Sequence, residues 1–138
     1  MDMNVLIIDA QGGGIGRQLV SAMKKRFPKQ MITAVGTNSA AASAMLKAGA
    51  DQAATGENAV VVCSRNADLI IGPVGIVIAD ALLGESTPTM AVAVGQSRAK
   101  RILIPVNHCD NYIVGVPDLA LGRLIDGVIK EVEKYIEG

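Results

Sequence analysis

The stretch NVLIIDAQGGGIGRQ, residues 4–18, predicts a parallel α/β fold because an apolar strand leads directly into a glycine-rich turn and a helix. Residues 3–9 form a short apolar run that ends at Asp9, as a buried strand does. Over residues 15–27 the apolar side chains recur at the spacing of one helix face. The glycines of residues 12–16 lie between strand and helix, where doubly wound folds bind their ligands.

The rest of the chain continues this alternation of strand-like and helix-like segments. GENAVVVCSR, residues 56–65, fits a strand because it has three consecutive valines, but the alternation of elements favours a helix. NYIVGV, residues 111–116, fits a sixth strand, either antiparallel or at an edge. We expect the other strands at 31–36, 50–55, 68–72 and 101–106, and the other helices at 39–48, 75–84, 87–99 and from the N-cap Asp118 to Ile136.

This order of elements predicts a single Rossmann-like domain over residues 1–138. Its architecture is a three-layer α/β sandwich with a mostly parallel sheet of five or six strands. Half of the residues are apolar, but the chain has one Phe, two Tyr and no Trp. The core is therefore built from aliphatic side chains, which suit parallel strands that are buried on both faces.

Charge and composition exclude several classes of function. The 13 basic and 13 acidic residues give no net charge, so no overall field attracts nucleic acid. No apolar run reaches the ~18 residues that span a bilayer, so we expect no membrane partner and a cytoplasmic protein. Cys63 and Cys109 lie far apart and outside any metal-ligand spacing, so we expect no metal site.

The glycine-rich turn matches none of the known phosphate-loop templates fully. Its glycines do not give the GxGxxG spacing of dinucleotide loops. The TGxxxGIG pattern of short-chain dehydrogenases requires threonine and glycine at its first two positions, where this chain has Asp9 and Ala10. The catalytic Tyr–Lys pair of that family is also missing. A Walker-type loop would have Arg17 and Gln18 in place of its lysine and hydroxyl residue, so nucleotide hydrolysis is not expected. What remains is a turn that either holds an anion by its backbone or only lets helix and strand pack closely.

Polar and glycine-rich segments follow three further predicted strands, at the same edge of the sheet. Residues 37–39 either bind a ribose or its 2′-phosphate, or cap the next helix. GPVG, residues 72–75, keeps side chains away from the expected crevice, and Asn107 follows the fifth strand. The ligand is expected to contact Gln11, Gly12, Gly13, Gly14, Ile15, Gly16, Thr37, Asn38, Ser39, Gly72, Pro73, Gly75 and Asn107.

Three residues are candidates for catalysis. His108 is the only histidine, and its place after the fifth strand suits a general acid or base, although a lone histidine beside Cys and Asp more often belongs to a turn than to a site. Asp80 lies in the predicted apolar helix 75–84 and either faces the crevice or marks the wet side of that helix. Asp9 ends the first strand beside the glycines. The motifs name no reaction.

The sequence also resembles a family of small bacterial proteins known only as a domain of unknown function. The resemblance rests on four stretches: IIDAQGGGIG, GTNSAAASAMLKAGAD continuing to ATGENAVVV, ADLIIGPVGIVIADALLGE, and AVAVGQSRAKRILIPVN. Members of that family typically have glycine where this chain has Ala10. The resemblance implies a single Rossmann-like domain and brings no reaction, substrate or catalytic residue.

Together these patterns predict a protein that binds a nucleotide, such as NAD(P), or another phosphate-bearing small molecule at residues 11–16. An alternative is a non-enzymatic interaction or regulatory protein that uses the fold as a scaffold. Two apolar, small-residue segments, GIVIADALLG at 75–84 and TMAVAVG at 89–95, favour a homodimer or a higher homo-oligomer. A third alternative is a small enzyme that works through Asp9, Asp80 or His108.

Overall fold

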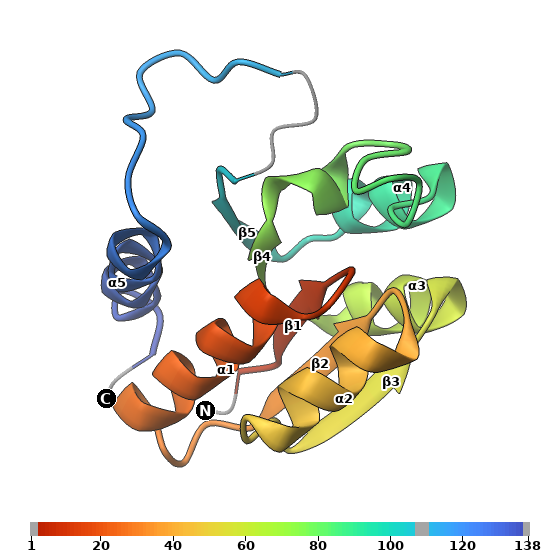
Figure 1. The fold of residues 1–138 in the computed structure, drawn as a ribbon. Helices are drawn as coiled ribbons and strands as arrows, with labels where there is room; N and C mark the ends of the chain where they lie inside the picture. The colour runs from red at the N-terminus through yellow and green to blue at the C-terminus, as the bar shows by residue number, and fades with distance from the viewer. Residues whose placement is uncertain (1–2, 107–110, 137–138) are drawn as a thin grey trace.

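The structure, a computed structural model, describes residues 3–106 and 111–136. Figure 1 shows a twisted sheet with helices on both of its faces. The strands are β1 (Val5–Asp9), β2 (Ile32–Gly36), β3 (Gln52–Thr55), β4 (Leu69–Pro73) and β5 (Lys100–Ile104). The helices are α1 (Gly14–Arg26), α2 (Ser39–Lys47), α3 (Glu57–Asn66), α4 (Pro88–Gln96), α5 (Leu121–Val132) and a short 3-10 helix, η1 (Val74–Val77), that follows β4.

The sheet has the strand order β3-β2-β1-β4-β5, and all neighbouring strands are parallel. From β1 the chain winds outward through β2 to β3, and α3 then carries it back across the sheet to β4. Because such crossovers are right-handed, the two halves place their helices on opposite faces. Helix α1 contacts α2 and α5 on one face, and α3 contacts α4 on the other. The predicted three-layer α/β sandwich is confirmed, with five strands.

Alternate residues of the central strands divide the core into two layers. Val5 and Ile7 of β1 belong to the cluster that α1, α2 and α5 cover. Leu6 and Ile8 belong to the cluster beneath α3 and α4. Every residue of β1 is buried, as expected of a parallel strand covered on both faces. The same alternation turns Asp9 toward the face that carries α1.

The segment 56–65 is a helix, α3, as the alternation of elements predicts. The predicted sixth strand is wrong, since residues 111–116 form no strand in the part of the chain that the structure describes. Gly115 adopts a left-handed conformation with φ 83°, and the Val116 N–H donates to the Ile113 carbonyl at 3.3 Å. This turn breaks the extended run, and Figure 1 shows the segment as a loop that leads to α5.

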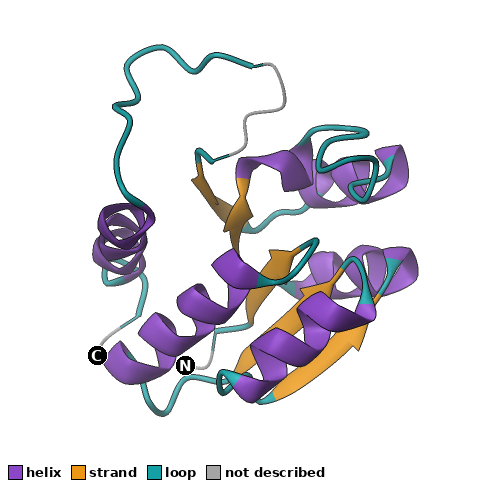
Figure 2. Ribbon diagram, viewed as in Figure 1, coloured by secondary structure: helices purple, strands orange, loops and turns teal. Residues whose placement is uncertain are grey.

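The predicted helix over residues 75–84 is also wrong. Only η1 is helical here, and Figure 2 shows the chain between η1 and α4 as loop. Asp80, Leu82 and Leu83 have positive φ angles of 64°, 59° and 58°, which a right-handed helix excludes. The apolar side chains of Ala81 and Leu82 are instead buried beside Ala10, so tertiary contact overrides the helical pattern.

The start of the last helix also differs from the prediction. Asp118 does not cap the last helix: α5 begins at Leu121, and its N-cap Ala120 offers no side-chain hydrogen bond. The buried face of α5 consists of Ile125, Val128 and Val132, so residues before Leu121 have no core contact to hold them helical. The start of α4 agrees with the prediction, because Thr87 caps it and Pro88 opens it.

Candidate functional site

The candidate site lies at the carboxyl ends of β1, β2 and β4. The strand order reverses direction between β1 and β4, because the chain leaves β1 toward β2 and leaves β4 toward β5. Open parallel sheets bind ligands in the crevice outside the strand ends at this reversal. The glycine loop, residues 10–16, includes the first residues of α1 and borders this crevice on the β1 side.

Two glycines of this region are required by packing. Gly13 is left-handed, with φ 74°, and a Cβ there would lie 2.9 Å from the Cα atom of Ala41. A Cβ on Gly16 would lie 2.6 Å from the Met45 sulfur and 2.8 Å from the Asp9 Cβ. Both glycines therefore let α1 approach β1 and α2 closely. Close packing of helix and strand is one of the two roles that the sequence suggests for the glycine-rich turn.

The other two glycines, Gly12 and Gly14, have no such role. A Cβ on either would meet nothing within 4 Å, and neither has a positive φ. Both residues are exposed. Among residues 3–106 and 111–136, their N–H groups find no hydrogen-bond acceptor, whereas the Gly13 N–H donates to the Ala10 carbonyl at 3.0 Å. Two exposed donors thus lie beside the N-terminus of α1, whose dipole attracts negative charge.

Asp9 places a carboxylate directly behind this helix N-terminus. Its side chain is 4% exposed, and its Oδ2 accepts a 2.6 Å hydrogen bond from the Gly16 N–H. Burial raises the pKa of Asp9 above its ordinary value, and the nearby Glu85 charge raises it further, while the N–H groups of Gly16, Ala10 and Ile15 lower it in part. Asp9 therefore binds its proton more readily than an exposed aspartate does.

Glu85 joins the glycine loop to the carboxyl end of β2. Its Oε1 accepts hydrogen bonds from the Gln11 N–H at 2.8 Å, the Thr37 hydroxyl at 2.7 Å and the Asn38 side-chain amide at 2.8 Å. Burial alone would raise the pKa of Glu85, but the hydrogen bonds from Thr37, Gln11 and Asn38 outweigh it, so the pKa is lowered. Glu85 therefore stays ionised at the point where residues of three segments meet.

Sequence reasoning missed Glu85. The pattern of residues 75–84 predicts a helix, which would leave Glu85 beyond its end with no link to residue 37 or 38. No spacing rule connects these positions, because their contact depends on the loop that crosses from β4 to β2. The stretch LLGESTP does show an acid next to a helix cap, but that pattern alone indicates only a turn.

Apart from the GPVG segment, one of the remaining candidate residues lies at the site, two are exposed, and the others lie outside the described part of the chain. Asn38 caps α2, with its side-chain oxygen accepting from the Ala41 N–H at 2.9 Å, and also contacts Glu85. Ser39 is exposed at the first position of α2. Asp80 is exposed in the loop after η1 rather than in an apolar helix, and its N–H donates to the Ser86 carbonyl. Asn107, His108 and the neighbouring Cys109 lie outside the described residues.

The GPVG segment after β4 is part of the packing. A Cβ on Gly72 would collide with the Ile8 carbonyl oxygen, so this glycine lets β4 and β1 approach each other. Pro73 is the last residue of β4 and is paired with Ile104. A Cβ on Gly75 would lie 3.0 Å from the Leu82 side chain. Gly75 thus lets the loop after η1 pack close to the end of β4.

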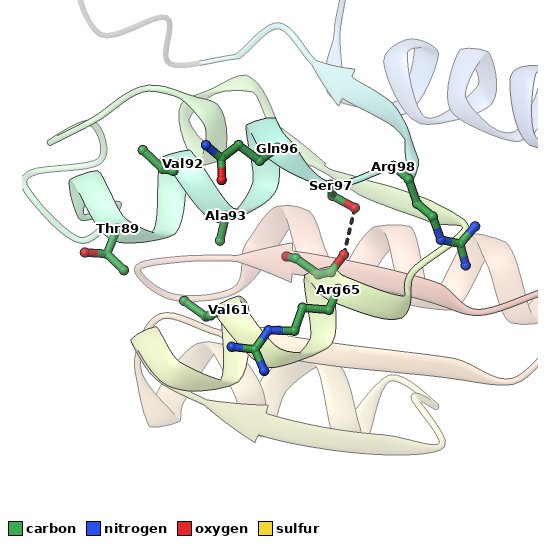
Figure 3. Close-up of a pocket in the computed structure, with 9 residues that line it drawn as sticks. Val61, Arg65, Thr89, Val92, Ala93, Gln96, Ser97 and Arg98 are labelled. Atoms are coloured by element: carbon green, nitrogen blue, oxygen red, sulfur yellow. Dashed lines mark hydrogen bonds between the residues drawn. The ribbon is translucent and has the colours of Figure 1, made fainter.

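A groove away from the glycine loop lies between α3 and α4. It has a volume of about 540 Å³ and is open to solvent along its length. Figure 3 shows the Arg65 and Arg98 side chains pointing away from each other along it, and the Ser97 hydroxyl donating to the Ser64 carbonyl at 2.7 Å. No residue of this groove belongs to the glycine loop, to α2 or to the Glu85 contacts.

Two other findings bear on the classes of ligand. Among the residues that the structure describes, no group of three or more His, Cys, Asp or Glu side chains is placed to hold a metal ion. None of the described helices has the length and apolar character needed to cross a bilayer.

Comparison with solved structures supports the fold. The chain is similar to a dodecameric FMN-dependent UbiX-like decarboxylase from Escherichia coli O157:H7, with a TM-score of 0.52 and 16% sequence identity. The match covers 97% of this chain and 99% of the decarboxylase chain. At this identity the likeness concerns the fold alone.

Comparison at the level of sequence identifies the family. No functionally curated protein matches the chain. The sequence profile of the family described as "Domain of unknown function (DUF3842)" matches residues 4–137. The resemblance seen in the glycine-rich start and the three stretches that follow it is thereby confirmed, and the chain belongs to the DUF3842 family.

Proposed function

We propose that this protein binds a nucleotide or another phosphate-bearing small molecule at the glycine loop. The observation that carries the proposal is the pair of exposed N–H groups at Gly12 and Gly14, which have no acceptor within the described chain. They lie beside a helix N-terminus and at the carboxyl edge of a parallel sheet. A phosphate oxygen matches these donors in both charge and hydrogen-bonding capacity.

The glycines themselves support the proposal. Alanine would fit at Gly12 and Gly14 without a collision, and glycine loses more conformational freedom on folding than alanine does. Packing therefore gives no reason for glycine at these two positions. A ligand that approaches the backbone closely gives such a reason, because a Cβ would lie between it and the N–H groups.

The similar decarboxylase is FMN-dependent. This supports a mononucleotide such as FMN as the first probe, with NAD and NADP as the dinucleotide alternatives that the loop position suggests.

Calorimetric titration of the purified protein with FMN, AMP, NAD, NADP and inorganic phosphate tests the proposal. We expect saturable binding of at least one probe, weakened about tenfold or more in Gly12→Ala and Gly14→Ala, since each lost charged hydrogen bond contributes roughly 1.5–3 kcal/mol. Gly95→Ala is the matched control, because Gly95 lies in α4 with open space around it. Equal affinity in all four proteins, or no binding of any probe, contradicts the proposal.

A specific observation also favours a homo-oligomer. Tyr112 and Val114 are 83% and 85% exposed on the loop before α5, which is unusual for neighbouring apolar side chains. The similar decarboxylase is a dodecamer. We propose that this loop contacts further copies of the chain in a cytoplasmic assembly. Light scattering should give a mass above that of one chain, lowered in Tyr112→Ser. A monomeric mass for the unmodified protein rejects the assembly.

A further inference from the structure

The loop between η1 and α4 covers part of the candidate site. We call residues 78–86 the strap. Its Leu82 and Ala81 are buried in a small cluster with Ala10, the first residue of the glycine loop. The last turn of the strap brings Glu85 to the carboxyl end of β2. The strap therefore connects the β4 side of the crevice to the β2 side.

The strap is held in a costly backbone conformation. Asp80, Leu82 and Leu83 are left-handed without being glycine, and Gly84 continues the left-handed run with φ 86°. A left-handed conformation is less stable than a right-handed one for a residue with a side chain, because the Cβ comes too close to the following carbonyl oxygen. Burial of the Leu83 side chain does not offset the cost of its left-handed conformation, since Leu83 is 95% exposed. Hydrogen bonds within the strap offset part of this cost, among them those from the Asp80 N–H to the Ser86 carbonyl at 2.7 Å and from the Ser86 N–H to the Ala81 carbonyl at 3.1 Å. Contacts with the rest of the protein add to them.

The strongest of these contacts is the Glu85 carboxylate. One oxygen of Glu85 accepts three hydrogen bonds, two of them from side chains of residues 37 and 38 and one from the backbone of Gln11. The remaining contacts of the strap with the glycine loop are apolar and involve two small or medium side chains. Charged hydrogen bonds are about twice as strong as neutral ones, so Glu85 is the main latch.

The three donors around Glu85 form a site for an anionic oxygen. A backbone N–H, a hydroxyl and an amide N–H from two separate loops converge on one point at 2.7–2.8 Å. Such a set recognises a carboxylate or phosphate oxygen whatever molecule carries it. In this structure the protein's own Glu85 takes that position.

We infer that Gln11, Thr37 and Asn38 form an anion subsite at the end of β2, and that the strap is a lid which opens when a ligand's phosphate or carboxylate replaces Glu85. This inference rests on the proposed function, because the ligand enters the same crevice. It adds a second anion-binding position, separate from the Gly12 and Gly14 donors. It also makes Glu85 a built-in competitor of the ligand.

Hydrogen exchange of the strap amides in Glu85→Gln tests the lid without any ligand. The glutamine keeps the shape of Glu85 but accepts the three hydrogen bonds as a neutral group. We expect exchange of residues 79–86 to quicken at least about fivefold, with the rest of the sheet unchanged. Asp126→Asn, which removes an exposed charge on α5, is the matched control. Glu85→Ala, which removes the acceptor entirely, should quicken the same amides further.

Titration with inorganic phosphate and AMP then tests the replacement of Glu85. We expect Glu85→Gln to bind the anion at least about fivefold more tightly than the unmodified protein, because the internal competitor is weakened. Anion binding should quicken strap exchange in the unmodified protein. Weaker binding by Glu85→Gln, or slower strap exchange on binding, overturns the inference, since Glu85 would then contact the ligand directly.

The two proposals fail separately. Unchanged strap exchange in both Glu85 variants overturns the lid even if nucleotides bind to Gly12 and Gly14. Absence of binding in every variant, Glu85→Gln included, overturns the proposed function and the anion subsite together, and this result is distinct from the first.

Discussion

At the residue scale, the glycine loop separates into positions that pack and positions that face solvent. Gly13 and Gly16 have neighbours that exclude a side chain, whereas Gly12 and Gly14 have open space. The Gly16 N–H donates to the Asp9 carboxylate and is therefore not free to bind an anion. The binding capacity of the loop therefore depends on two donors rather than on the whole run of glycines.

Substitutions at Gly16 and Gly12 should differ in their effect on stability. We expect Gly16→Ala to lower the free energy of unfolding by about 1–3 kcal/mol, because its Cβ collides with Met45 and Asp9. Gly12→Ala should change it by less than about 1 kcal/mol, or raise it, because the space is open. Urea denaturation measures both. Equal destabilisation by the two variants would contradict this division of the loop.

The buried carboxyl of Asp9 should make stability depend on pH. Aspartate in the unfolded chain titrates near its ordinary pKa of 3.8, and burial raises the pKa in the fold. The folded protein then binds the proton more tightly, so this group favours folding below pH 3.8 and loses that contribution as the pH rises through its raised pKa.

Asp9→Asn isolates this contribution. The free energy of unfolding of Asp9→Asn has no contribution from titration at residue 9. The unmodified protein should therefore lose stability relative to Asp9→Asn as the pH rises above 3.8. Denaturation at several pH values measures the difference, with Asp126→Asn as a control for an exposed carboxylate. A difference that stays constant or grows in favour of the unmodified protein would show that the Asp9 pKa is not raised.

At the scale of elements, side-chain caps fix where α2 and α4 begin. Asn38 caps α2 through the Ala41 N–H, and Thr87 caps α4 through the Met90 N–H. Asn38 has further tasks, because its amide donates to Glu85 and to the Gln11 carbonyl. The start of α2 is thereby tied to both the strap and the glycine loop.

Alanine substitutions at the two N-caps should measure how much the additional hydrogen bonds of Asn38 contribute to stability. Thr87→Ala should lower the free energy of unfolding by about 1 kcal/mol, the usual effect of losing a cap. Asn38→Ala should lower it by about 2–3 kcal/mol, because the hydrogen bonds to Glu85 and Gln11 are lost as well. Thermal or urea unfolding distinguishes the two, and equal losses would mean that the strap contact contributes nothing to stability.

At the scale of the whole molecule, α5 is the element with the longest connection. The loop after β5 leaves the sheet, and α5 returns to contact α1 and β5 (Figure 1). Its buried side chains, Ile125, Val128 and Val132, join the core cluster that covers one face of the sheet. The third helix of this layer is thus held by its apolar face rather than by a short turn.

Truncation of this apolar face should release α5. We expect Ile125→Ala to lower the free energy of unfolding by about 2–5 kcal/mol, as other large-to-small core changes do. Hydrogen exchange should quicken along α5 before it quickens in the central strands. Asp126→Asn, its exposed neighbour, should stay within about 0.5 kcal/mol. Exchange that remains slow in α5 of Ile125→Ala would contradict this docking.

The sequence by itself determined the elements whose pattern is repeated and local. Apolar runs predict all five strands, and the helical spacing after Asp9 predicts α1, because burial on both faces or on one stripe imposes a period on the chain. The same reasoning located the glycine loop at a strand end. It predicted the wrong secondary structure for residues 75–84 and 111–116, because apolar side chains there do not follow the spacing of a helix or strand in their contacts.

Only the tertiary structure decided what the candidate site contains. It brought Glu85 to Thr37 and Asn38 across 48 and 47 positions of the chain, and it set Asp9 behind the helix that the glycines begin. Neither contact follows a period, because both depend on how the strap crosses the ends of the strands. The periodicity of buried residues can be recognised from a short stretch of sequence. Polar groups from separate loops, in contrast, come into contact only when the sheet has assembled.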